Sequence, residues 1–141
     1  MTAKRSSGDN AMTQTLGNIT LLVRDYDEAI AYYTTVLGFI LLEHTALGGG
    51  SRWVRVAPPG PGGTAVLLAL ANTDNPAERV GDQTGGRVGF FLHTDDFAGD
   101  FAAMTARGVR FLEAPRTEKN GMAAAFEDLY GNRWDLLELR E

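Results

Sequence analysis

The sequence predicts an α+β protein in which one strand-helix-strand-strand-strand unit occurs twice along a single chain. Apolar runs, a helical segment and glycine-rich stops follow one another in the same order in both halves. The two helical segments, Asp25 to Gly38 and Asp96 to Gly108, differ in length by a single residue. Matching lengths, stops and helix faces indicate an internal duplication, and repeated units of this kind usually pack into one continuous body.

The first unit opens with an apolar run over residues 18–25, whose β-branched and aliphatic side chains are typical of a buried strand. A helix is expected over residues 25–38, because Asp25 can cap its first turn and apolar residues then recur at helical spacing. Gly38 is expected to end this helix. Three further apolar runs, separated by glycine-rich and proline-rich loops, are expected as strands over residues 39–47, 52–58 and 64–71.

The second unit repeats this order after a polar stretch that contains Pro76 and ends in two glycines. A strand is expected over residues 87–94, a helix over 95–108, and strands over 109–115, 121–128 and 132–139. The predicted organisation is therefore a flexible tail over residues 1–14, a first module over 15–71, a linker over 72–86 and a second module over 87–141.

The composition bounds the class of protein. A chain of 141 residues with 44% hydrophobic and 22% charged residues is typical of one folded domain. A net charge of −5 without a basic stripe argues against nucleic-acid binding. No apolar stretch approaches a membrane span, and we expect no membrane partner and no signal peptide. The absence of cysteine excludes disulfide and thiolate chemistry, and a cytoplasmic location is expected.

Two segments resemble the vicinal oxygen chelate superfamily, which includes glyoxalases, bleomycin resistance proteins and extradiol dioxygenases. The segment VRDYDEAIAYYTTVLGF, residues 23–39, is similar to the family's first strand and helix, and FEDLYGNRWDLLEL, residues 126–139, is similar to its final hairpin. The resemblance implies two βαβββ modules whose mixed sheets curl around a cavity. Because isomerases, dioxygenases and drug-binding proteins share this fold, the fold alone selects no reaction.

The resemblance also implies where metal-using members of the family place their ligands. These positions lie on the first and last strands of the modules and fall on Asn18, Ala69, Asp135 and, depending on the alignment, Gly89 or Val88. Only Asp135 keeps a strong ligand type, because asparagine is a weak ligand and the other side chains offer no donor. We therefore expect no metal at the usual site, while a divalent metal at a shifted site stays open.

The candidate catalytic residues are His93 and Asp135. An imidazole at the end of a strand, directly before a helix cap, could transfer protons or anchor a ligand. A structural role is the alternative for both, His93 bonding the helix start and Asp135 pairing with an arginine. The candidate ligand-binding residues offer polar groups, aromatic walls or positive charge on the predicted strands, and they are Asn18, Thr20, Trp53, Phe91 and Arg52. Core, interface or solvated positions are the alternatives for these five.

These observations favour a protein of the glyoxalase and bleomycin-resistance type that binds a small molecule in a sheet-lined cavity. One alternative is a metal-dependent lyase, isomerase or dioxygenase of the glyoxalase I or extradiol type with a shifted site. The other is a non-enzymatic protein that sequesters a drug, which needs only apolar walls and a few polar anchors. A homodimer is expected, because the edges of curled sheets otherwise invite uncontrolled pairing.

Overall fold

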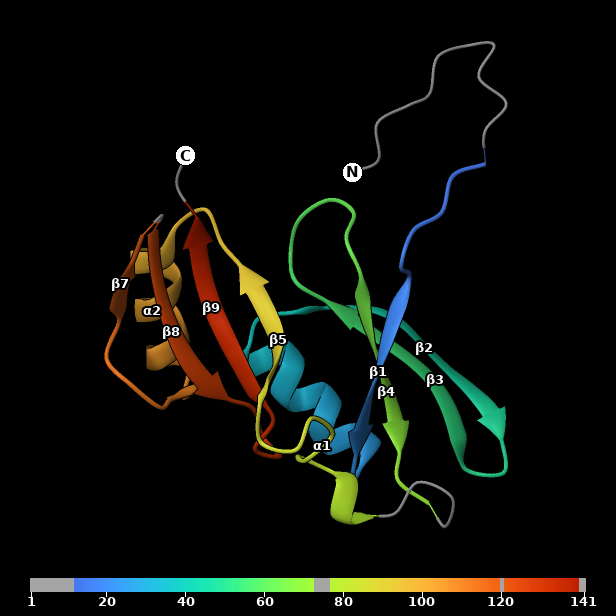
Figure 1. The fold of residues 1–141 in the computed structure, drawn as a ribbon. Helices are drawn as coiled ribbons and strands as arrows, with labels where there is room; N and C mark the ends of the chain where they lie inside the picture. Colours follow the sequence, from blue (N-terminus) through green and yellow to red (C-terminus); the bar gives the residue numbers. More distant parts are fainter. Residues whose placement is uncertain (1–11, 73–76, 120, 140–141) are drawn as a thin grey trace.

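Two mixed sheets of the same topology make up the protein, as seen in a computed structural model that describes residues 12–72, 77–119 and 121–139 (Figure 1). Sheet A has the strand order β1 (Asn18–Val23), β4 (Ala65–Leu70), β3 (Ser51–Ala57) and β2 (Ile40–Gly48). Sheet B has the order β5 (Val88–His93), β9 (Arg133–Leu139), β8 (Gly121–Glu127) and β6 (Arg110–Phe111), and β7 (Arg116–Glu118) also pairs with β8. In sheet A β1 lies parallel to β4, and in sheet B β5 lies parallel to β9. This shared order confirms the two predicted βαβββ modules, whereas most of the predicted N-terminal tail lies outside the described residues.

The predicted helices form where their capping signals lie. Asp25 caps α1 (Tyr26–Ala31) by accepting a 2.9 Å hydrogen bond from the backbone N–H of Glu28, and a π-helical turn, η1 (Tyr32–Val36), continues it. Asp96 caps α2 (Phe97–Ala106) by accepting from the N–H of Gly99 at 3.1 Å. A 3-10 turn, η2 (Ala77–Arg79), lies between the modules. No helix in the described ranges has the length and hydropathy needed to span a membrane.

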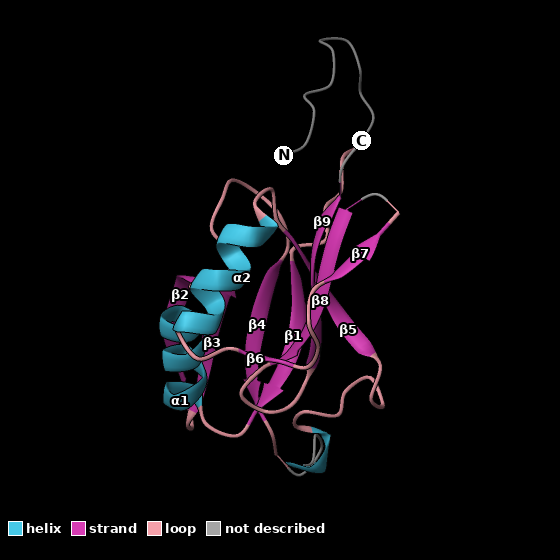
Figure 2. Cartoon of the chain, turned by 90° about the vertical axis from the view of Figure 1, so that its left-hand side faces the viewer, coloured by secondary structure: helices cyan, strands magenta, loops and turns pink. Residues whose placement is uncertain are grey.

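One hydrophobic core joins the two modules. The inner faces of both sheets contribute to it, and Figure 2 shows α1 and α2 following one another along one side of the molecule. The ring of Tyr33, on η1, lies 6.2 Å from that of Trp134 on β9, and the ring of Phe39 lies 5.8 Å from the same indole. Because the inner faces share one core, the outer faces of sheets A and B both point away from it.

The single strand predicted over residues 109–115 is wrong in extent. Within this range the structure has only the short strand β6, and after a break the chain pairs again as β7, which begins at Arg116. The carboxylate of Glu113 accepts a 2.7 Å hydrogen bond from the N–H of Ala125 on β8, so that a side chain replaces the carbonyl of a paired strand. Pro115 offers no N–H to continue a ladder. The chain then returns to β8 as β7, which places Arg116 beside the outer face of sheet B.

The final hairpin turns at Gly131 and Asn132. Gly131 has a positive φ, +95°, but Asn132 does not, and among the described residues only glycines adopt positive φ. Asn132 is instead buried and donates from Nδ2 to the carboxylate of Asp128 at 3.0 Å. The asparagine of this motif therefore stabilises the hairpin through its side chain.

Replacing Gly38 by alanine is expected to lower the free energy of unfolding by about 1 to 2 kcal/mol. Gly38 ends the first helix with φ +81°, and a Cβ at this position would lie 3.1 Å from Nη2 of Arg107. Arg107 is held in place, because its Nε donates to the carbonyl of Val36 at 2.8 Å. Gly17→Ala is the matched control, since its Cβ would meet open space. Equal urea midpoints for the two variants would contradict the prediction.

Candidate ligand site

The outer face of sheet B brings together the two candidate catalytic residues. The register pairs Phe91 with Asp135 and His93 with Leu137, so these four side chains lie on one face. A register shift between Val88 and Phe90 leaves a bulge just before them. His93 and Asp135 nevertheless line different hollows, and no hydrogen bond within the described part of the chain joins them.

Asp135 lies in a hollow of about 310 Å³ on this face, which we call the carboxylate hollow. Its lining residues are Arg116, Glu118, Lys119, Asp135, Leu137 and Leu139. The side chain of Asp135 is only 9% exposed, and its Oδ2 accepts a 2.8 Å hydrogen bond from Nη2 of Arg116. Its Oδ1 is buried and has no hydrogen-bond partner among the described residues. Since buried polar atoms are normally paired, Oδ1 is an unused acceptor on a residue that lines the hollow.

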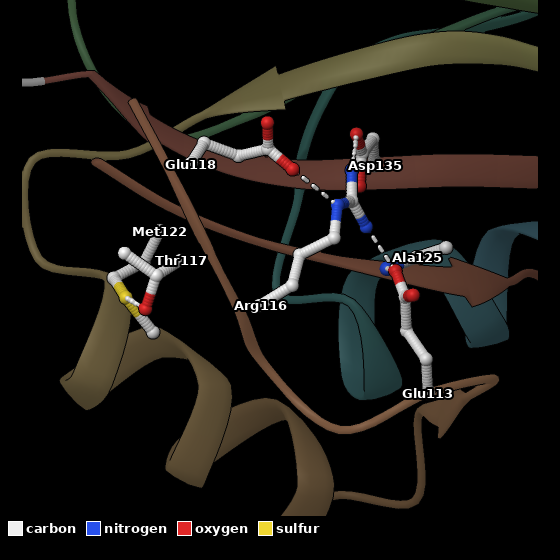
Figure 3. Close-up of polar contacts among 7 residues, drawn as sticks. All are labelled: Glu113, Arg116, Thr117, Glu118, Met122, Ala125 and Asp135. Carbon is white, nitrogen blue, oxygen red and sulfur yellow. Dashed lines mark hydrogen bonds and ion pairs between the residues drawn. The ribbon is translucent and has the colours of Figure 1, made fainter. Parts of the chain in front are cut away.

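Three carboxylates hold the guanidinium of Arg116 (Figure 3). Nε donates to Glu118 at 2.7 Å, Nη2 donates to Asp135 at 2.8 Å, and Nη1 donates to Glu113. The hydrogen bond to Glu118, followed by that to Asp135, raises the pKa of Arg116 above its ordinary value. Negative charge therefore exceeds positive charge around this guanidinium.

Glu113, Arg116 and Glu118 were not among the predicted site residues. Their signal in the sequence is the charged run EAPRTEK, which flanks a proline just after a short apolar run. Such a run resembles an ordinary solvated loop until its pairing with β8 is known.

Three of the predicted ligand-binding residues, Asn18, Thr20 and Trp53, occupy strand positions on the outer face of sheet A. There Arg55 donates from Nε to Oδ1 of Asn18 at 2.8 Å and from Nη1 to Glu43 at 2.7 Å. Trp53 donates from Nε1 to the same oxygen of Glu43 at 3.1 Å. Hydrogen bonds from Arg55 and Trp53 lower the pKa of Glu43. None of these residues lines the carboxylate hollow, so one chain does not bring this cluster to it.

Arg52 lies on the opposite face of β3 from Trp53, because neighbouring residues of a strand alternate in direction. Its Nη1 is 2.7 Å from Asp27, and its guanidinium lies 5.1 Å from the ring centroid of Tyr26. The same Nη1 lies 3.3 Å from Nε2 of His44. The hydrogen bond from Arg52 lowers the pKa of Asp27. Arg52 thus contacts α1 rather than the outer face on which Asn18 lies.

The residues at the family's metal positions do not fit a metal ion. The amide oxygen of Asn18 accepts from Arg55, and one carboxylate oxygen of Asp135 accepts from Arg116. Ala69 has no donor atom, and any Cβ at Gly89 would lie 2.6 Å from Cγ2 of Thr84. In residues 12–72, 77–119 and 121–139, no three His, Cys, Asp or Glu side chains are grouped so that they could hold a metal.

Two further hollows lie between the modules. An inter-module groove of about 650 Å³ is lined by His93, Met104 and Arg107 on one side and by Pro58 on the other. A smaller, apolar cleft of about 220 Å³ is lined by Phe91 and by residues of β4 and β9. The three candidate residues of sheet B are therefore distributed over three different hollows.

Comparison with known proteins identifies the family. The sequence profile of the Glyoxalase/Bleomycin resistance protein/Dioxygenase superfamily matches residues 15–136, and the chain therefore belongs to this superfamily. An uncharacterized protein of Shewanella frigidimarina is 46% identical over 131 residues, which cover 92% of this chain and 97% of that protein.

Solved structures show the same relationship. TnmS3, described as an antibiotic binding protein from Streptomyces, is similar with a TM-score of 0.74 and 28% identity, over 92% of this chain and 99% of TnmS3. A glyoxalase/bleomycin resistance protein from Streptomyces is similar with a TM-score of 0.69 and 30% identity, over 86% of this chain and 98% of that protein.

Proposed function

We propose that this protein binds a small organic molecule in the carboxylate hollow without a resident metal. The observation that carries the proposal is the unpaired, buried Oδ1 of Asp135, which can accept a hydrogen bond from a ligand. Leu137 and Leu139 supply an apolar wall beside it. Ligand sites combine apolar walls with a few oriented polar groups in this way. The likeness to TnmS3, which is described as antibiotic binding, supports an antibiotic-like ligand.

A second copy of the chain completes the pocket in this proposal. Within one chain the outer faces of both sheets point away from the shared core, so each is free to meet the outer face of another copy. Phe91 and Leu139, on the outer face of sheet B, are 59% and 58% exposed, as expected for apolar residues of an interface. Asn18 and Trp53 of the partner would then cover the carboxylate hollow. Light scattering after size exclusion should report a dimer, and a monomer at the concentration of the binding assays would contradict this part.

A metal-dependent lyase or dioxygenase is the less supported alternative. The metal positions retain one carboxylate, Asp135, and Arg116 already binds it. His93 and Asp135 share a face, yet they line separate hollows. These contacts favour binding over catalysis by this pair.

The test is a thermal-shift screen and calorimetric titration of the wild-type protein with a panel of antibiotics that includes bleomycin. We expect at least one compound to raise Tm, because a ligand present at 100 times its Kd stabilises the folded state by about 2.7 kcal/mol. Asp135→Asn preserves the shape of the side chain but removes its charge, and it should weaken that compound's binding by about tenfold.

Asp82→Asn is the matched control, because Asp82 is exposed and lies outside the carboxylate hollow. Its affinity for the compound should equal that of the wild type. The proposed function fails if no compound binds, or if Asp135→Asn binds the compound as tightly as the wild type does.

A further inference from the structure

We propose that the guanidinium of Arg116 competes with the ligand for the carboxylates of the hollow. The ligand is then a planar organic cation, with an amidinium or guanidinium group on an apolar body. This inference rests on the proposed function, since it concerns the same hollow. In the free protein the guanidinium of Arg116 occupies the position that the cationic group of the ligand would take.

The carboxylates around Arg116 are arranged for a planar, forked cation. Glu118, Glu113 and Asp135 each accept from a different nitrogen of the guanidinium, namely Nε, Nη1 and Nη2. Bonds of this kind select a planar group over a point charge such as an ammonium. Two of the acceptors are also positioned independently of Arg116, because Glu113 accepts from the N–H of Ala125 and Asp135 is buried on β9 (Figure 3).

Arg116 itself is held loosely enough to leave. It lies on β7, a strand of three residues that pairs with β8 and with no other strand of the described residues, off the main path of sheet B. Its side chain is 38% exposed, and the side chains of Glu113 and Glu118 are exposed to a similar degree. The ion pairs of Arg116 with Glu113 and Glu118 are exposed, and such pairs contribute little to stability. Asp135 is buried, but a ligand cation that replaces the guanidinium would keep this carboxylate paired.

A ligand can form one bond that Arg116 does not form. Arg116 reaches only Oδ2 of Asp135, and Oδ1 stays unpaired. An amidinium that enters the hollow could donate to both oxygens in the bidentate arrangement typical of such pairs. Its apolar body would then contact Leu137 and Leu139. Lys119 also lines the hollow, but the three carboxylates still outnumber the two cationic side chains.

The experiment uses benzamidine as the planar cation and benzamide as its neutral analogue of the same shape. Calorimetric titration of the full-length Arg116→Ala variant should show benzamidine binding at least about tenfold tighter than in the wild type. Benzamide should show no comparable gain. Adding Asp135→Asn to Arg116→Ala should remove the gain.

Arg110→Ala is the matched control, because Arg110 forms one exposed ion pair, with Glu127, on the same sheet. It should bind benzamidine as the wild type does. If Arg116→Ala does not fold by circular dichroism, Arg116→Gln, which keeps most of the volume, replaces it with the same expected gain.

An unchanged benzamidine affinity in the folded Arg116 variant overturns the inference. An equal gain for benzamide also overturns it, because that result would show an emptied space rather than a planar-cation site. The two proposals fail separately. Wild-type protein that binds an antibiotic while Arg116→Ala gains no benzamidine affinity refutes the inference alone, whereas a gain without any antibiotic binding refutes the proposed function alone.

Discussion

Replacing Asp128 by alanine is expected to lower the free energy of unfolding by about 3 to 5 kcal/mol. This buried carboxylate accepts from the hydroxyl of Tyr33 at 2.5 Å and from Nε1 of Trp134 at 3.1 Å. It also accepts from the N–H groups of Tyr130 and Asn132, each at 3.0 Å. Removing it leaves several buried donors unpaired at once, including the tyrosine that connects η1 to sheet B.

Urea unfolding followed by tryptophan fluorescence measures this effect. Asp128→Asn should cost less than Asp128→Ala, because its amide oxygen still accepts some of the bonds. Asp82→Ala, an exposed substitution, should leave the unfolding free energy almost unchanged. A loss below about 1 kcal/mol for Asp128→Ala would contradict the central role of this carboxylate.

Raising the pH above about 10 is expected to destabilise the protein steeply. Burial raises the pKa of Tyr33 well above its ordinary value, and the charge of Asp128 and its hydrogen bond raise it further. In the unfolded chain this tyrosine ionises near pH 10, so above that pH the folded state binds more protons than the unfolded state. The stability that the protonated phenol of Tyr33 contributes is fully present below pH 10. It falls by about 1.4 kcal/mol per pH unit as the pH rises toward the pKa of Tyr33 in the folded state.

Tyr32 and Tyr130 act in the same direction. Burial is the main cause of the raised pKa of both phenols, and the hydrogen bond to Glu28 contributes for Tyr130. Both are partly solvated, so their contributions to the pH dependence are smaller than that of Tyr33.

Urea midpoints measured between about pH 8 and pH 12, with tyrosinate absorbance in parallel, test the alkaline transition. Tyr33→Phe should be less stable than the wild type at pH 8, because the bond to Asp128 is lost, but its stability should fall less steeply above pH 10. The same slope in Tyr33→Phe and the wild type would show that Tyr33 does not carry the transition.

Local signals in the sequence were sufficient for most of the fold. Asp25 and Asp96 cap the helices and Gly38 ends the first one, because each of these roles depends only on residues within one turn. The strand beginning near residue 109 was predicted less well. Its break depends on Glu113, whose carboxylate bonds Ala125 on another strand, and no local pattern reports such a contact.

Part of the candidate site was predictable for a similar reason. Alternation along a strand places Phe91 on the same face as His93, and the register adds Asp135 to that face. Alternation also points Arg52 and Trp53, which are neighbours on β3, to opposite faces of sheet A, although both were predicted as ligand-binding residues. The two residues therefore cannot line one site on a single face of this sheet.

The sequence by itself determined the duplicated module and the absence of thiol chemistry, and its resemblance to the family implied that ligand residue types are missing at most of the usual metal positions. These properties follow from the identity and local order of residues. Only the tertiary structure decided that His93, Phe91 and Asp135 line different hollows, that Arg116 reaches Asp135, and that one oxygen of this carboxylate stays unpaired. The physical reason is that β7 meets β9 through β8, so the contact depends on the register of three strands rather than on spacing along the chain.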